Sequence, residues 1–377
     1  MESKKRILKL VSKGVISVEE GVRLLEKLKM TEKDPAEHIQ ESSAEKIEFS
    51  ENLNKAFSQI GDAFKYLGSQ FKPLANQVGD NLKSALHSAK NSVDMKEVKI
   101  KVPTLAFKSF EASYTFAENA ATIVNIENFN GYTKIISSEN DSVVLDVEGK
   151  VYAEKIADAK DIFEQNAIID VTDEKIFIKA PSLRIKTNFT LSLPKRVYDY
   201  VSVANINGAI KINPLQAADV ILNTKNGQVD VANYQLTMLE ISVLNGDVVV
   251  GDGKMLNSII KTTNGAVSFA GRAKSLSVNI TNGNSKITFA NEEIEKILIN
   301  NVNGNIKLAL PSKLGIIGNA KTTFGEIKTR IQEMEVLKRQ TKKVLKFKRD
   351  GAKKVNVAVK TTTGNIYLKD TDERNKR

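Results

Sequence analysis

The residues Ile241–Asp252 read ISVLNGDVVVGD, and Ile260–Gly271, nineteen positions later, read IKTTNGAVSFAG. In both stretches apolar residues alternate with polar ones on each side of an Asn-Gly pair. Alternation with a period of two is typical of a half-buried β-strand. Asn-Gly is typical of a sharp reversal, because both residues tolerate a positive φ. Each stretch therefore predicts a strand, a corner and a second strand.

The Asn-Gly pair recurs along the chain at a nearly constant spacing. A fixed period of about twenty residues indicates a stacked repeat architecture. The glycines from 208 to 325 are 19, 19, 19, 18, 21 and 21 residues apart. The pairs are Asn207-Gly208, Asn226-Gly227, Asn245-Gly246, Asn264-Gly265, Asn282-Gly283 and Asn303-Gly304, with an early copy at Asn130-Gly131 and variants at Phe324-Gly325 and Thr363-Gly364.

This spacing predicts a mainly β fold, a β-solenoid with rungs of 19–21 residues, over residues 98–370. A meander of hairpins is the rival topology, since Asn-Gly is also a hairpin signal. We expect the corner Asn residues to take a positive φ and to hydrogen-bond along the stack. The Gly283 unit departs from the pattern, because its apolar pair Ile287 and Phe289 is displaced by two positions. That displacement predicts a bulge or a longer corner there.

The chain before residue 98 has a helical pattern. Residues 1–32 predict a hairpin of two short helices, with Gly14 ending the first and the capping box Ser17-Val18-Glu19-Glu20 starting the second. Packing or oligomerisation and a DNA-reading helix-turn-helix are the two interpretations. The acidic start of the second helix favours the former, since base contacts are made there. The polar residues 33–50 predict a linker.

A second helical signal follows over residues 51–95. A heptad-like apolar seam runs from Leu53 to Val78, with Phe57, Phe64 and Phe71 at every seventh position. Pro73, together with Gly61, Gly68 and Gly79, lowers the helix propensity of this segment. The segment is either a stripe that packs on a partner helix or on the solenoid, or a helix that lies on a membrane surface. Under the second interpretation the three Phe residues contact a membrane, a peptide or a partner.

The net charge is +11, and most of it lies at the C-terminal end. Residues 321–377 hold 17 Lys/Arg against 7 Asp/Glu, whereas residues 1–50 hold ten of each. Within the gap between Gly325 and Gly364, residues 331–355 form a basic insertion. Residues 371–377 form a separate C-terminal tail. The insertion is either a solvated loop whose lysines protect an edge strand, or a site for an anionic surface. The candidate contact residues are Lys338, Arg339, Lys342, Lys343, Lys346, Lys348, Arg349, Lys353 and Lys354.

Two segments of the chain resemble known modules. Arg6–Leu28, RILKLVSKGVISVEEGVRLLEKL, resembles the SHOCT-like N-terminal module of Gram-positive proteins of the YvlB/LiaX type. The Asn-Gly repeats look like those of the DUF4097 adhesin-like β-strand-repeat family. The resemblance implies a β-solenoid without catalysis at the cell envelope, where family members are linked to sensing or resisting membrane-active antimicrobial peptides.

No enzyme motif is present in the sequence. The chain has no Cys and only two His, His38 and His87, and no GxGxxG, Walker loop, HExxH or GxSxG. We therefore expect no catalysis, no cofactor and no metal. A carboxylate pair brought together by stacked rungs, as in carbohydrate-cleaving β-helices, remains an alternative, with Asp230, Asp247 and Asp252 among the scattered acids.

The function expected from these observations is that of a non-enzymatic envelope-associated platform in the envelope-stress or antimicrobial-peptide response. Its expected partners are a membrane surface or anionic wall polymer, with antimicrobial peptides, envelope-stress signalling proteins or self-association as further options. Nothing at the N-terminus resembles a signal peptide, and no apolar run of eighteen residues occurs. We expect a peripheral protein with a cytoplasmic pool as an option. A cytoplasmic nucleic-acid-binding regulator is the alternative function.

Overall fold

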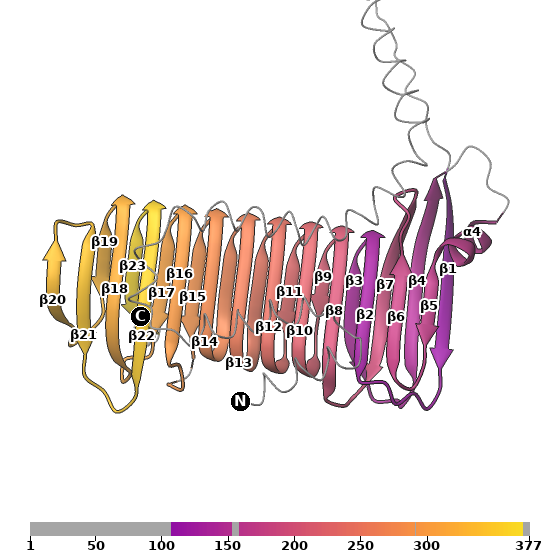
Figure 1. Cartoon of the computed structure of the whole chain (residues 1–377), viewed down its shortest axis with the longest axis horizontal. Helices are drawn as coiled ribbons and strands as arrows, with labels where there is room; N and C mark the ends of the chain where they lie inside the picture. The colour runs from indigo at the N-terminus through magenta and orange to yellow at the C-terminus, as the bar shows by residue number, and fades with distance from the viewer. Residues whose placement is uncertain (1–106, 153–157, 291, 372–377) are drawn as a thin grey trace, which may run out of the picture. The chain divides into compact units, whose positions relative to one another are not determined.

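The computed structural model describes residues 107–152, 158–290 and 292–371, which belong to one compact unit. The predicted helical segments at 1–32 and 51–95 and the linker between them lie outside these residues. Within the described residues the chain is almost entirely β-strand, with one α-helix, α4 (Ala159–Asn166), capped by Asp158. The prediction of a mainly β repeat fold is confirmed (Figure 1).

The strands form two faces joined by corners. In spatial order, the first face contains β5 (Ile168–Val171), β6 (Lys175–Ala180), β2 (Ile123–Asn130), β8 (Tyr198–Asn207), β10 (Leu215–Asn226), β12 (Tyr234–Asn245), β13 (Val248–Asn264), β14 (Val267–Asn282), β16 (Lys296–Asn303), β22 (Lys354–Thr363), β18 (Gly315–Phe324), β21 (Val344–Arg349) and β20 (Glu335–Gln340).

The second face contains β1 (Phe107–Phe116), β4 (Val143–Tyr152), β7 (Ile185–Pro194), β3 (Thr133–Ser138), β9 (Ile210–Ile212), β11 (Val229–Ala232), the first residues of β13 and β14, β15 (Ser285–Phe289), β17 (Ile306–Leu310), β23 (Ile366–Asp370) and β19 (Ile327–Arg330). Each rung has two corners, the Asn-Gly corner and a second corner, which in β13 lies near Gly251. The long strands β13 and β14 pass through this second corner without a break and so belong to both faces.

Neighbouring rungs in the middle of the stack pair in parallel and in constant register. Leu222 on β10 lies opposite Ile241 on β12, and Ile241 lies opposite Ile260 on β13. Each pair is one sequence period apart, so every rung repeats the path of its neighbour. This parallel pairing excludes the meander of hairpins, in which neighbouring strands would be antiparallel.

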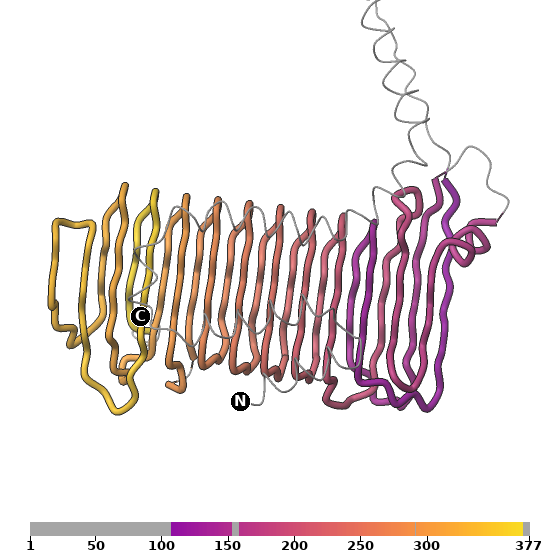
Figure 2. The backbone as a smooth tube through the Cα atoms, viewed as in Figure 1, coloured from indigo at the N-terminus to yellow at the C-terminus, as the bar shows by residue number. Residues whose placement is uncertain are grey.

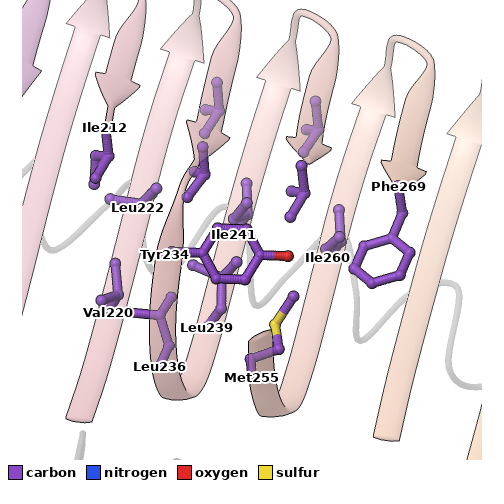
Figure 3. Packing of buried hydrophobic residues seen from close by; sticks show 14 of the residues in the cluster. Ile212, Val220, Leu222, Tyr234, Leu236, Leu239, Ile241, Met255, Ile260 and Phe269 are labelled. Atoms are coloured by element: carbon purple, nitrogen blue, oxygen red, sulfur yellow. The ribbon is translucent and has the colours of Figure 1, made fainter. Parts of the chain in front are cut away.

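The core fills the space between the two faces. Leu222, Ile241 and Ile260 form one row of fully buried side chains across three rungs, and Val220 and Leu239 begin the next row (Figure 3). Because inward positions recur at every second residue, the stack buries one continuous hydrophobic column. The repeats therefore stabilise one another through this column.

The Asn-Gly corners require glycine for two reasons. Gly246 has a φ of +155°, and an added Cβ would lie 2.1 Å from the carbonyl oxygen of Gly227 in the neighbouring rung. The close approach arises because corner glycine N–H groups donate to the carbonyl of the residue before the glycine in the neighbouring rung, as from Gly246 to Asn264 at 2.9 Å. Corner glycines therefore stack directly on one another.

The corner Asn side chains form a hydrogen-bonded ladder, as predicted. The Asn245 Nδ2 donates to Asn226 Oδ1 at 2.9 Å, and Asn264 Nδ2 donates to Asn245 Oδ1 at 2.8 Å. The ladder extends from Asn207 to Asn303. The expectation of a positive φ at Asn was wrong, because the positive φ belongs to most of the corner glycines.

The prediction of a bulge or a longer corner after Gly283 was also wrong. Ser285 lies opposite Val267 and Ile287 opposite Phe269, in unbroken register. Ser285 is simply a buried polar residue at a position that is apolar in neighbouring rungs. The irregularity responsible for the 18-residue period lies at the second corner of the preceding rung, where the register of β13 against β14 shifts between Gly251 and Lys254.

Both ends of the stack depart from the parallel pattern. At the N-terminal end β1, β4 and β7 pair in antiparallel fashion, and α4 contacts β1 and β4. At the C-terminal end the last rung, β22 and β23, lies between the rung of β16 and β17 and the rung of β18 and β19. The yellow strands between orange ones in Figure 1, and the tube of Figure 2, show this exchange.

Candidate functional site

The basic insertion is an ordered β-hairpin at the C-terminal end of the stack. Its strands β20 and β21 pair in antiparallel fashion, and β21 pairs with β18. Leu345 and Phe347 point inward and are buried, which anchors the hairpin to the core. We call its accessible basic residues the basic cap, namely Lys338, Arg339, Lys342, Lys343, Lys346 and Lys348.

The strand register concentrates positive charge on the outer side of this hairpin. Lys338 lies directly opposite Lys346, and both side chains are exposed. Directly opposed residues on antiparallel strands have their Cβ atoms about 5 Å apart, and like charges there repel. Lys321 on β18 lies opposite Val344 and adds a further exposed cation beside the cap. An anion bound here would relieve the repulsion.

The hairpin turn packs against the last glycine corner. Thr322 N–H donates to the Lys343 carbonyl, and Ile327 N–H donates to the Lys342 carbonyl, both at 2.9 Å. These bonds hold the Lys343 Nζ 6.0 Å from the ring centroid of Phe324, whose side chain is 66% exposed. A large apolar side chain therefore lies in contact with solvent beside the ammonium group of Lys343.

Two carboxylates neutralise part of the cap. The Lys342 Nζ lies 3.1 Å from Glu326 Oε1, and this hydrogen bond and charge lower the pKa of the Glu326 carboxyl. The Lys348 Nζ lies 3.0 Å from Glu335, whose hydrogen bond and charge raise the pKa of the Lys348 ammonium. Both pairs are exposed to solvent, so each contributes little to stability. Lys338, Lys343 and Lys346 carry most of the cap's available charge.

Arg349 does not belong to the site, contrary to the prediction. Its side chain is 2% exposed and pairs with Asp370 at 2.6 Å. The remaining guanidinium nitrogens donate to the carbonyls of Leu314 and Pro311. Arg349 is buried because side chains on a strand alternate between its two sides. It lies two places after Phe347 and four after Leu345, so it points inward like them. Arg349 locks the hairpin and the chain end together.

The predicted residues Lys353 and Lys354 are exposed but follow β21 rather than forming part of the hairpin. The stacking also produces a basic row on the second face that the sequence analysis missed. Lys286, Lys307 and Lys328 occupy equivalent positions on β15, β17 and β19, with Tyr367 between the last two. Each of these residues stands three places after a corner glycine, which is the signal that identifies the row.

The acids considered for catalysis have structural surroundings. Asp247 Oδ1 accepts the N–H of Ala266 in the next rung at 2.7 Å, and Asp230 lies 3.9 Å from Lys211. Asp252 has a φ of +49° and occupies the irregular second corner. In residues 107–152, 158–290 and 292–371, no three His, Cys, Asp or Glu residues gather as metal ligands would.

Other predicted features lie elsewhere. Phe57, Phe64 and Phe71 fall outside the described residues, as do His38 and His87. In the part of the chain that the structure describes, no helix has the length and hydropathy to cross a bilayer.

The model of the Toastrack DUF4097 family matches residues 125–369. The chain belongs to this family. A SHOCT-like domain model matches residues 2–33, so the expected combination of modules is confirmed. The chain is also 26% identical over 374 residues to the uncharacterized protein YvlB of Bacillus subtilis, covering 98% of each chain.

Solved structures with a similar chain trace have lower sequence identity to this chain. One is described as a "putative adhesin" from Bacteroides fragilis, 15% identical, with a TM-score of 0.42 and coverage of 69% of this chain and 97% of that one. Another is described as a "putative lipid binding protein" from Parabacteroides distasonis, 10% identical, with a TM-score of 0.37 and coverage of 69% and 96%.

Proposed function

We propose that this Toastrack protein is a non-enzymatic, peripheral protein of the cell envelope that docks on anionic lipid through its basic cap. The observation that carries the proposal is the contact between exposed Phe324 and Lys343 of the hairpin turn. Binding at a lipid interface combines an apolar anchor with cations near the headgroups. Exposed Leu337 and Val336 on β20 enlarge the apolar part.

The proposal is tested with vesicles and two matched triple variants. Flotation with anionic vesicles should recover the protein, and zwitterionic vesicles should not. Lys338→Glu, Lys343→Glu and Lys346→Glu together should weaken binding at least ~100-fold, at about 1 kcal/mol per basic residue near the surface. The control is Lys150→Glu, Lys186→Glu and Lys225→Glu, which makes the same charge change away from the cap. Equal binding by both variants would contradict the proposal.

The same variants separate other anionic ligands from lipid. If a soluble anionic wall polymer competes with vesicles and the cap variant loses the polymer more than the lipid, the polymer is the ligand. If the cap variant loses duplex DNA while keeping lipid, and DNA binding falls steeply with salt, the nucleic-acid regulator replaces the proposal.

The finer role that we propose is in the response to membrane-active cationic peptides. It is supported by the family membership and by the charge of the cap, which would compete with cationic peptides for the same headgroups. Cells lacking the protein should be more sensitive to such a peptide, and the cap triple variant should fail to restore resistance while the control triple restores it. Unchanged sensitivity in the cells lacking the protein would end this part of the proposal.

A further inference from the structure

The outer side of the first face holds side chains that solvent does not reach. On β10, β12 and β13 the inward residues are Leu222, Ile241 and Ile260, so the residues before them point outward. These outward residues form one row, Ile221, Glu240 and Ile259, with exposed fractions of only 4%, 3% and 5%.

A second outward row shows the same property. Tyr200, Asp219, Met238, Asn257 and Ser275 lie opposite one another from β8 to β14. Tyr200, Met238 and Ser275 are buried, as is Asp219. By contrast, outward Lys211 and Lys307 on the second face are exposed. The low exposure is therefore a property of this face and not of outward positions in general.

Nothing within residues 107–152, 158–290 and 292–371 accounts for a cover over the two rows. The helix of this part of the chain, α4, contacts β1 and β4 at the far end of the stack. Side chains on an open sheet surface keep one side towards water, so values this low require another layer. That layer must bury Ile221, Ile259 and Met238 and be compatible with the carboxylates of Asp219 and Glu240 beside them.

We propose that this outer face of β8 to β14 is an intramolecular docking site for the N-terminal segment Lys4–Met30. The segment has the required chemistry in its sequence. Val22, Leu25 and Leu28 supply an apolar stripe at helical spacing, which needs a surface to cover it. Arg23 and Lys27 lie beside that stripe and complement the carboxylates of Asp219 and Glu240.

The dimensions also agree. Residues 17–30 in α-helical form would be about 21 Å long at about 1.5 Å per residue. The five strands from β8 to β14 span about 19 Å at about 4.8 Å per strand. More than seventy residues separate the segment from β1, and an extended chain of that length reaches on the order of 200 Å, so the linker imposes no limit. Docking withholds the apolar stripe from other partners.

The natural absence of cysteine allows a direct accessibility test. Ser275→Cys places a thiol of nearly the same size on the covered face, and Lys286→Cys places one at an exposed outward position of the second face. In the full chain a maleimide should label position 286 rapidly and position 275 slowly. Adding Leu25→Asp and Leu28→Asp should raise the labelling rate at position 275 at least about tenfold, because the face is then permanently uncovered instead of uncovered only in brief local openings. The labelling rate at position 286 should stay unchanged.

Three results would overturn the proposal. Labelling of position 275 as fast as position 286 in the otherwise unchanged chain would mean that the face is open. Slow labelling that persists with Leu25→Asp and Leu28→Asp would mean that another segment covers it. Slow labelling that becomes fast on dilution would assign the cover to a second copy of the chain. Circular dichroism of every variant checks that the β-sheet is retained.

Discussion

At the residue scale, the corner glycines carry a constraint that no other residue in the rung carries. Gly246 combines a positive φ with a carbonyl oxygen 2.1 Å from the position of a Cβ. Gly251, five residues later in the same rung, has neither feature, since the nearest atom to its Cβ position is 4.0 Å away. The two glycines therefore form a matched pair for mutation.

We predict that Gly246→Ala lowers the free energy of unfolding by about 3 kcal/mol, because the backbones of two rungs must separate and the strained φ is retained. Gly251→Ala should change it by less than about 1 kcal/mol. Urea denaturation followed by circular dichroism gives both values. Similar values for the two variants would show that stacking of the corners does not limit the approach of the rungs.

The residue pattern predicts the rungs well because equivalent positions in successive rungs point to the same side of the sheet and have the same surroundings. The alternation around Gly246 is repeated around Gly265 at the same inward positions, and the ladder of Asn245 follows from that repetition. Arg349 shows where charge misled the sequence analysis. Arg349 falls on the same side of its strand as Leu345 and Phe347, and Asp370 falls on the same side as Ile366 and Leu368. The alternation of the two strands therefore already indicated a buried pair.

At the scale of elements, the hairpin β20–β21 is an edge structure held by specific contacts. β20 has one strand neighbour, β21, and its free side carries exposed charged residues, which also discourages pairing with another chain. The turn joins the corner at Phe324 and Gly325 through the backbone of Lys342 and Lys343. The sequence showed the charge of this segment but not its pairing, because Val344, Leu345 and Phe347 fit a loop anchor equally well.

We predict a pH response at the turn. The pKa of Glu326 is lowered by Lys342, so the pair is present above the ordinary pKa of a glutamate and is lost as the pH falls through the lowered value. NMR titration should give Glu326 a pKa below 4.5, and Lys342→Ala should raise it towards that value. A Glu326 pKa that does not respond to Lys342→Ala would show that the two side chains do not pair in solution.

At the scale of the whole molecule, the order of rungs in space differs from their order in the sequence. The rung at Gly364 stacks on Gly304, and the rung at Gly325 stacks on Gly364. This exchange does not follow from the sequence, because the Gly325 and Gly364 units share the same alternation and the same Ile two places after the glycine, Ile327 and Ile366, so either unit fits either neighbour. The docking face was equally hidden, since outward Ile221 and Ile259 read as ordinary strand residues.

We predict that the chain end is essential for the C-terminal third of the stack. Truncation after Asp350 removes β22 and β23. β22 lies between β16 and β18, and β23 lies between β17 and β19. The rung at Gly325 and the basic cap should then detach, leaving β16 as an open edge that aggregates. Limited proteolysis and size-exclusion chromatography test this. Truncation after Thr371 keeps every strand and is the control, and equal behaviour of the two would contradict the prediction.

The constant register of the middle rungs has a consequence for how such a protein can change in length. Each end is closed by its own antiparallel arrangement, so a unit added there would have no matching neighbour. A duplicated nineteen-residue unit between Asn226 and Asn264 would instead stack in the same parallel register on the rungs on both sides. It would move the two ends apart by one strand spacing, about 4.8 Å. The length of the stack can thus be adjusted from the inside while the basic cap at one end and the antiparallel strands at the other stay unchanged.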